Sequence, residues 1–185
     1  RHRPDPQDIN GNGIKDVFER VINGYGTSNP NIPDGFTTQG IRLHIIESGE
    51  IPTTHENYLT ITYVETNYYN VYFTPARHGI FHYCVFGHLI SGGAYGISNN
   101  KDVFILADEA LGVQLQYESR IFMHELGHGL LDENAIPYYV DTDSNGVKDH
   151  NPTFGTMMYT GGPVSDMPLD YGVDWKYIDL TLFNQ

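Results

Sequence analysis

The sequence predicts one layered domain of the α/β or α+β class, in which a small sheet packs against helices. Segments with the alternation of strands and segments with the spacing of helices follow one another along the chain, as in layered folds of this class. The 185 residues can bury one sizeable core, and the composition does not force a division into two. Within this domain we expect an N-terminal segment and linker over 1–35 and a larger unit over 36–185.

The first part of the chain is expected to hold a short helix, a linker and strands. Residues 17–24, VFERVING, have the pattern of a helix that ends at Gly24, and the Gly-, Pro- and Asn-rich residues 24–35 are typical of a linker. Apolar and polar residues alternate in 40–49, GIRLHIIESG, as in a strand. Residues 58–73 are dense in β-branched and aromatic residues and are interpreted mostly as strand, although helical spacing is compatible with them.

The middle of the chain alternates between helix and strand patterns. Pro75 is expected to open a helix that runs through 76–88. Residues 91–100, SGGAYGISNN, are interpreted as a glycine-rich edge segment, and residues 102–106, DVFIL, as a short strand. The core face of the expected 76–88 helix would consist of Ile80, Phe81, Cys84 and Val85.

A second helix is expected over about 116–131, because apolar residues recur there at core spacing. Its core face would consist of Ile121, Phe122, Leu126 and Leu130. The stretch HELGH, 124–128, lies on this helix and places His124 and His128 one turn apart, with about 6 Å of axial rise between them. Two imidazoles at this spacing can reach one zinc ion, and Glu125 beside them can act as the general acid and base of a zinc hydrolase.

A second motif lies downstream of this helix. Together with HELGH, the stretch GTMMY, 155–159, resembles the metzincin clan of zinc endopeptidases. The segments GIFHYCVF, SGGAYGI and DWKYIDL are also similar to a bacterial and archaeal branch of the clan, so the resemblance covers most of 36–185. It implies a small twisted mixed sheet packed on a backing helix and an active-site helix, with an irregular C-terminal part.

The resemblance also implies roles for single residues. Met157 matches the methionine of the turn that runs beneath the metal, and Tyr159 matches a tyrosine that binds the metal or stabilises the oxyanion. In the clan, the edge strand above the zinc pairs with the substrate backbone, as in β-augmentation. The segment in the corresponding place, 92–97, therefore makes Gly93, Ala94 and Tyr95 the expected substrate-binding residues.

The third zinc ligand departs from the clan pattern. A catalytic zinc usually takes three protein ligands, but the clan's turn glycine and third histidine correspond here to Leu131 and Asn134. His150 is preferred, because a loop before it could present its ring to the metal. Asp132 is the alternative and would require the helix to end at Gly129 and fold back, since it lies about 12 Å along the axis from His124. The remaining options are Glu133, Asn134 or no third protein ligand.

Two segments have the residue spacing of calcium loops, in which oxygen ligands two residues apart surround a hard cation. In the first, DINGNGIKDVFE, the expected ligands are Asp8, Asn10, Asn12, the Ile14 carbonyl, Asp16 and Glu19. In the second, DTDSNGVKDHNP, they are Asp141, Asp143, Asn145, the Val147 carbonyl and Asp149. The second loop has Pro152 at its closing position, so another group would have to complete it. Structural calcium that stabilises the folded chain is the expectation.

Charge and composition restrict the partners. A formal net charge of −13 argues against a nucleic-acid partner, because too few cations are present to neutralise phosphates. No apolar run is long enough to span a membrane. The single cysteine, Cys84, cannot form an intramolecular disulfide and is expected to be a buried free thiol. Weak calcium loops favour an extracellular or cell-surface location, and we expect a monomer.

These observations predict a zinc-dependent endopeptidase that acts on peptides or proteins and is stabilised by calcium, with 36–185 as its catalytic domain. The alternative is a catalytically inactive calcium-binding surface or adhesion module on a peptidase-like fold, suggested by the altered third-ligand pattern. A zinc hydrolase with another substrate would use the same chemistry. His78, His82 and His88 could suggest a second metal site, but no carboxylate is near them in the sequence, and structural roles are favoured.

Overall fold

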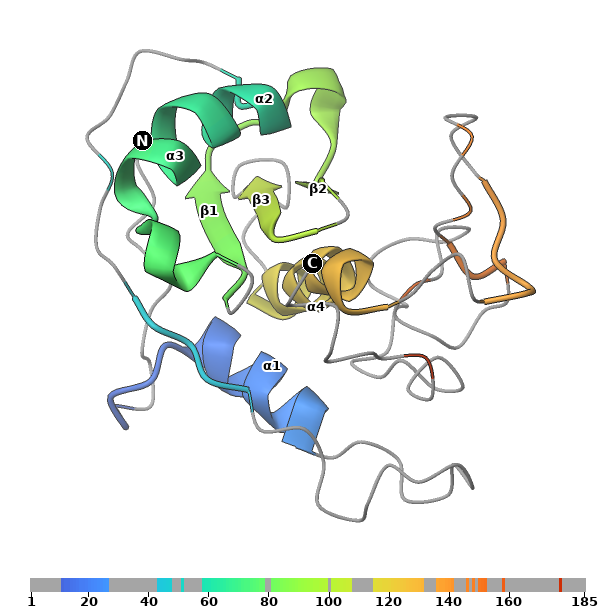
Figure 1. Ribbon diagram of the computed structural model, residues 1–185. Coiled ribbons are helices and arrows are strands. Elements are labelled where there is room, and N and C mark those ends of the chain that lie inside the picture. The colour runs from blue at the N-terminus through green and yellow to red at the C-terminus, as the bar shows by residue number, and fades with distance from the viewer. Residues whose placement is uncertain are drawn as a thin grey trace.

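A three-stranded mixed sheet forms the centre of the computed structural model (Figure 1). The structure describes residues 11–26, 43–47, 51, 58–78, 81–99, 101–107, 115–131, 136–141, 146, 148, 150–152, 158 and 177. The strand order is β1-β3-β2, where β1 is Tyr83–Gly87, β2 is Gly96–Ser98 and β3 is Val103–Ala107. β3 pairs in parallel with β1 and antiparallel with β2. The strand expected over 102–106 and the edge segment expected over 91–100 are therefore confirmed, as β3 and β2.

Both faces of the sheet are covered. All five residues of β3 are buried, and they alternate between two apolar clusters. Phe104 and Leu106 point toward one cluster, while Val103, Ile105 and Ala107 point toward the other. A central strand that is buried on both sides has a continuous apolar sequence, and β3 has the sequence VFILA.

One face of the sheet is covered by the helical segment α2 (Ile61–Val64), η1 (Glu65–Tyr69, a π-helix) and α3 (Asn70–Tyr72). In Figure 1 these turns lie above the strands. The expectation that 58–73 is mostly strand was wrong. The hydroxyl of Thr60 caps the first turn by accepting a hydrogen bond from the Tyr63 N–H at 3.1 Å. The buried residues then recur at helical spacing against the sheet, so packing overrides the β propensity of the side chains; they are Val64, Tyr68, Tyr69 and Phe73.

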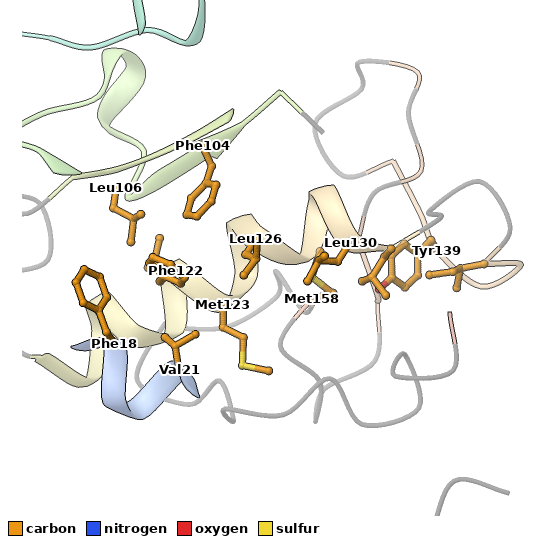
Figure 2. Close-up of a cluster of buried hydrophobic side chains, with 13 residues drawn as sticks. Phe18, Val21, Phe104, Leu106, Phe122, Met123, Leu126, Leu130, Tyr139 and Met158 are labelled. Atoms are coloured by element: carbon orange, nitrogen blue, oxygen red, sulfur yellow. The ribbon is translucent and has the colours of Figure 1, made fainter. Parts of the chain in front are cut away.

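The other face is covered by α4 (Leu115–Leu130), which confirms the helix expected over 116–131. A further helix, α1 (Asp16–Gly26), packs on α4 from the side away from the sheet and confirms the helix expected over 17–24. The rings of Phe18 and Phe122 meet edge to face with their centroids 6.0 Å apart, a geometry worth about 0.5–1.5 kcal/mol beyond area burial. Figure 2 shows Phe18 and Val21 reaching toward α4, whose Phe122 and Leu126 lie under β3.

This packing places α1 in the same apolar cluster as α4. Lys15 also forms an ion pair with Glu47 at 2.8 Å, which ties the start of α1 to the segment 43–47. The helix of the expected N-terminal segment is therefore part of the core that supports α4. The boundary expected near residue 35 lies outside the described residues.

Two further expectations were wrong. The helix expected over 76–88 is a single 3-10 turn, η2 (Pro75–Arg77), followed by β1. The side chains of β1 alternate: Cys84 and Phe86 face the α4 side, while Tyr83 and Val85 face the other. Pairing with β3 therefore selects the period of a strand over the helical spacing.

The strand expected over 40–49 is absent from its described part, 43–47, which has no regular secondary structure. The alternation itself is real, because Leu43 and Ile45 pack against the α1–α4 cluster and His44 is exposed. The segment lies beside α1 in Figure 1, so side-chain packing produces the alternation without a partner strand among the described residues.

The fold is thus a mixed α/β arrangement with a small mixed sheet between helical layers. In the described part of the chain, no helix combines the length and the apolar character that a bilayer span requires.

Candidate metal centre

Helix α4 supplies two of the candidate ligands. His124 and His128 lie one turn apart and are both buried, with 7% and 6% of their surface exposed. Apolar residues on other faces of the helix fix its orientation, because Phe122 and Leu126 belong to the cluster beneath the sheet. His124 and His128 project from the side of the helix opposite Phe122 and Leu126, so the apolar contacts that fix the helix also fix the direction of the two imidazoles.

Backbone hydrogen bonds carry the third candidate, His150. Its N–H donates to the Val140 carbonyl at 3.3 Å, and its carbonyl accepts from the Val140 N–H at 2.9 Å, which forms an isolated antiparallel bridge. The neighbouring Asn151 N–H donates to the carbonyl of Met158 at 3.0 Å. Main-chain contacts on both sides therefore fix the position from which the His150 ring reaches the helix.

The three histidines come together in one group. Each offers a ring nitrogen, and these atoms lie within 4.8 Å of one another. The ring centroid of His150 lies 5.3 Å from that of His124 and 5.0 Å from that of His128. Three imidazoles that converge on one point form a ligand set that suits zinc and leaves a fourth position open. The group could therefore hold a metal ion, and zinc fits its chemistry.

Of the alternatives for the third ligand, the structure describes only His150. Asp132, Glu133 and Asn134 lie outside the described residues. Helix α4 continues to Leu130 without a break at Gly129, and the Leu131 N–H still donates to the Gly127 carbonyl at 2.9 Å. The early helix end that Asp132 would require is therefore not observed.

Glu125 follows His124 in α4 and is also buried, with 6% of its surface exposed. Its side chain is packed against Gly96 of the edge strand β2. Burial raises the pKa of the Cys84 thiol on β1, and the nearby charge of Glu125 raises it further. Cys84 therefore stays a neutral thiol, consistent with the structural role expected from the sequence.

Several expected site residues lie outside the described part of the chain and are not placed. They are Asp8, Asn10, Asp143, Asn145, Val147, Asp149, Met157 and Tyr159. The methionine next to the expected turn residue is described: Met158 is fully buried in the α1–α4 cluster, and Figure 2 shows it beside Leu130. The resemblance to the metzincin clan assigned the turn methionine to Met157 and gave no role to the adjacent Met158.

The described parts of the two expected calcium loops have tight turns. Gly13 and Gly146, at the sixth position of each loop, have φ values of +87° and +90°. Glycine adopts this left-handed conformation at little cost. The Asp141 carboxylate accepts a hydrogen bond from the Gly146 N–H at 2.8 Å, and the Asn12 amide donates to Glu19 at 3.0 Å. The last residue of the first loop and the first residue of the second loop are thus bonded near the turn of their own loop.

His78 and His82 have packing roles, as expected. The His78 ring stacks on Tyr69 and Phe73, with centroids 4.6 and 5.5 Å away. His82 packs against α4 at Gly129, where an added Cβ would lie 2.7 Å from His82 Cε1 and would also meet the Lys101 carbonyl. A helical glycine costs about 1 kcal/mol relative to alanine, and this close approach explains its presence.

The turn that contacts Gly129 is fixed from the opposite layer. The Tyr69 hydroxyl donates to Asp102, and the Asn99 amide donates to Glu65 at 2.9 Å. Tyr69 and Glu65 both belong to the π-helix η1, so this unusual turn anchors the β2–β3 connection that contacts Gly129 of α4. The π-helix was missed because its sequence was interpreted as strand.

Comparison of the chain with protein-family models, curated proteins and solved structures finds no match, so the site is interpreted from its own geometry.

His150→Ala should weaken zinc binding by more than about 100-fold, beyond the 10–100-fold loss typical of residues that only support a ligand. The reason is that the variant removes one of three converging imidazoles. Competition with a chromogenic chelator would measure the affinity, with His44→Ala as the control at an exposed histidine. An unchanged affinity in His150→Ala together with a large loss in Asp132→Ala would assign the third position to Asp132.

His82 should make the folded chain less stable in acid. Burial lowers the pKa of His82 to about 4, against the opposing effects of the Asp102 charge and a hydrogen bond with the Lys101 backbone. Between pH 6.5 and 4 the unfolded chain binds a proton that the folded chain does not. This contribution to stability, about 3 kcal/mol, is therefore complete above pH 6.5 and is lost as the pH falls toward 4.

Urea unfolding at several pH values would measure this effect in parent and His82→Gln, with His44→Gln as the control. In the parent, His82 should make the free energy of unfolding fall by about 1.4 kcal/mol for each pH unit that the pH is lowered in this window. The His82→Gln variant should lack this part of the slope. Equal slopes in parent and His82→Gln would contradict the assignment.

Proposed function

We propose that the chain is a zinc-dependent endopeptidase. The observation that carries the proposal is the convergence of His124, His128 and His150, two of them on the helix that also carries the buried Glu125, which packs against β2, the edge strand of the described sheet. A zinc ion held by these histidines would polarise a substrate carbonyl and lower the pKa of water bound beside it. This combination matches the HELGH motif and the resemblance to metzincins.

Glu125 is the proposed general base and acid. It would accept a proton from the attacking water and then deliver that proton to the amide nitrogen as the C–N bond breaks. Its burial favours this role, because water is largely excluded from the carboxylate and its interactions with charges are stronger there. Tyr159 is proposed to stabilise the oxyanion, and Met157 to form the turn beneath the metal, on the resemblance alone.

The edge strand β2 is proposed to bind the substrate backbone. The register pairs Ile97 with Ile105. The Ala107 N–H donates to the Tyr95 carbonyl, and the Asn99 N–H donates to the Val103 carbonyl. Every second residue of this segment therefore has its backbone groups directed toward β3. The backbone N–H and carbonyl of Gly96 therefore point away from β3, toward the sheet edge. Gly96, rather than Gly93, Ala94 and Tyr95, is the better candidate for pairing with a peptide.

The contacts of the originally expected residues support this shift. The Gly93 N–H donates to the Ile90 carbonyl at 3.1 Å, and the Tyr95 carbonyl is bonded to Ala107. The side chain of Tyr95 is 45% exposed and could still contact a bound peptide. On the basis of this edge strand we propose a peptide or protein substrate. From the sequence we also propose an extracellular or cell-surface location and a monomeric state.

Two structural calcium ions are proposed from the loop spacing of 8–19 and 141–152. The first loop leads directly into α1, whose Phe18 and Val21 pack in the core that holds α4. The proposed ligands of the second loop, 141–149, lie between Val140 and His150, the two residues of the bridge that carries the third histidine. Calcium at either loop would therefore stabilise an element that supports the metal centre.

Glu125→Gln should abolish hydrolysis of an unfolded protein substrate while zinc binding is kept. The substitution keeps the shape of the side chain but removes its capacity to take a proton. A loss in kcat of at least about 100-fold is expected, as for general-base residues. Fluorescent casein peptides with zinc and calcium present would serve as substrate, with Ser91→Ala as the surface control.

Full activity of Glu125→Gln would exclude this mechanism. Absence of turnover in the parent, with calcium-dependent stability intact, would favour the inactive calcium-binding module.

Removal of calcium should lower the Tm of the zinc-loaded chain. At about 10 mM calcium and a Kd of about 0.1–1 mM, one site would contribute about 1.4–2.7 kcal/mol. For a chain of this size the Tm should then rise by about 3–10 °C per site. Thermal unfolding with and without calcium would test this, and Glu19→Gln should lose the part due to the first loop. Equal Tm values would exclude calcium at both loops.

A further inference from the structure

Gly96, in the edge strand β2, touches the side chain of Glu125. A Cβ at Gly96 would lie 2.5 Å from Glu125 Oε1, 2.6 Å from Glu125 Cγ and 2.5 Å from Ile121 Cγ2. Ordinary contacts between such atoms are about 3.5–4.0 Å. The strand and the helix therefore approach each other at this point more closely than any residue with a side chain would allow.

The contact lies on the α4 side of the strand. The neighbouring Ile97 packs into the opposite cluster with Ile105, so the Cα of Gly96 faces the helix. On the helix, Ile121 and Glu125 are one turn apart and both meet Gly96. The Glu125 carboxylate is thus bounded on one side by strand backbone instead of by another side chain.

We infer that Gly96 is a positioning residue for Glu125, because its missing side chain creates the space that the carboxylate occupies. The inference rests on the proposed function for its catalytic meaning. Ile121 is β-branched and has one strongly preferred rotamer in a helix, so it cannot easily move. A methyl group at position 96 would therefore displace the longer and more flexible side chain of Glu125.

The same residue links the base to the substrate. The backbone N–H and carbonyl of Gly96 point toward the sheet edge, where a peptide would pair. A peptide aligned on Gly96 would therefore have its backbone at a fixed distance from the Glu125 carboxylate. One close contact sets both the position of the base and the register of the substrate relative to it.

A double-mutant cycle on stability tests the contact without reference to activity. Gly96→Ala should lower the Tm of the parent by on the order of 5 °C, because overpacking typically costs 1–3 kcal/mol. In the Glu125→Ala background the same change should lower the Tm by less than half as much, because Cγ and the carboxylate are gone and only Ile121 remains.

Gly87→Ala is the matched control, since it is the same substitution in β1. A Cβ there would lie 3.3 Å from Leu59 Cγ and would meet the end of that side chain, on the opposite face of the sheet. It should destabilise the chain equally in both backgrounds. Equal effects of Gly96→Ala in the two backgrounds would overturn the inference. If Gly96→Ala does not fold, recovery of the fold in the double variant supports the inference, and no recovery overturns it.

Kinetics distinguish positioning from general destabilisation. Measured well below the Tm, Gly96→Ala should lower kcat by about 10–100-fold, as expected for a misplacement of about 1 Å. Zinc affinity should stay close to that of the parent, and Gly87→Ala should keep the parent's kcat. A parental kcat in Gly96→Ala would overturn the inference while leaving the proposed function intact. A parent chain that binds zinc but cleaves no peptide would overturn the function, and the stability cycle alone would then decide whether Gly96 positions Glu125.

Discussion

The packing of α4 against the sheet is the constraint on which the candidate site depends. One side of the helix is apolar and contacts Phe104 and Leu106, while α1 closes the side away from the sheet. Two histidines and two glutamates, Glu118 and Glu125, are buried in the same helix, which costs free energy unless they are bonded or bind an ion. The apolar contacts hold α4 in an orientation in which His124 and His128 converge with His150.

The third histidine reaches the helix through a different kind of interaction. His150 lies in an irregular part of the chain, where no apolar stripe orients it, and main-chain bonds to Val140 and between Asn151 and Met158 hold its segment. Met158 is fully buried in the cluster that also contains Leu130. The ligand segment is therefore anchored to the same core as the helix, so that a change in α4 packing would act on all three imidazoles.

Much of the site could be predicted from local sequence. HELGH defines its own geometry, because a helix places residues four apart on one face, and the loop before His150 made that residue the preferred third ligand. The helical layer over 61–72 and the strand β1 were assigned to the wrong type. In both segments the aromatic and β-branched residues suit either structure, and contact with the sheet or with β3 decided between them.

The sequence by itself determined the helix with its histidine pair, the strand β3 and the glycine turns, since each depends on spacing within a few residues. Only the tertiary structure decided that His150 joins the pair and that Gly96 lies against Glu125. These residues are more than twenty positions apart, and the distance between them depends on how helix, strand and irregular segments pack. No local pattern encodes that distance, because it results from the summed packing of side chains from several elements.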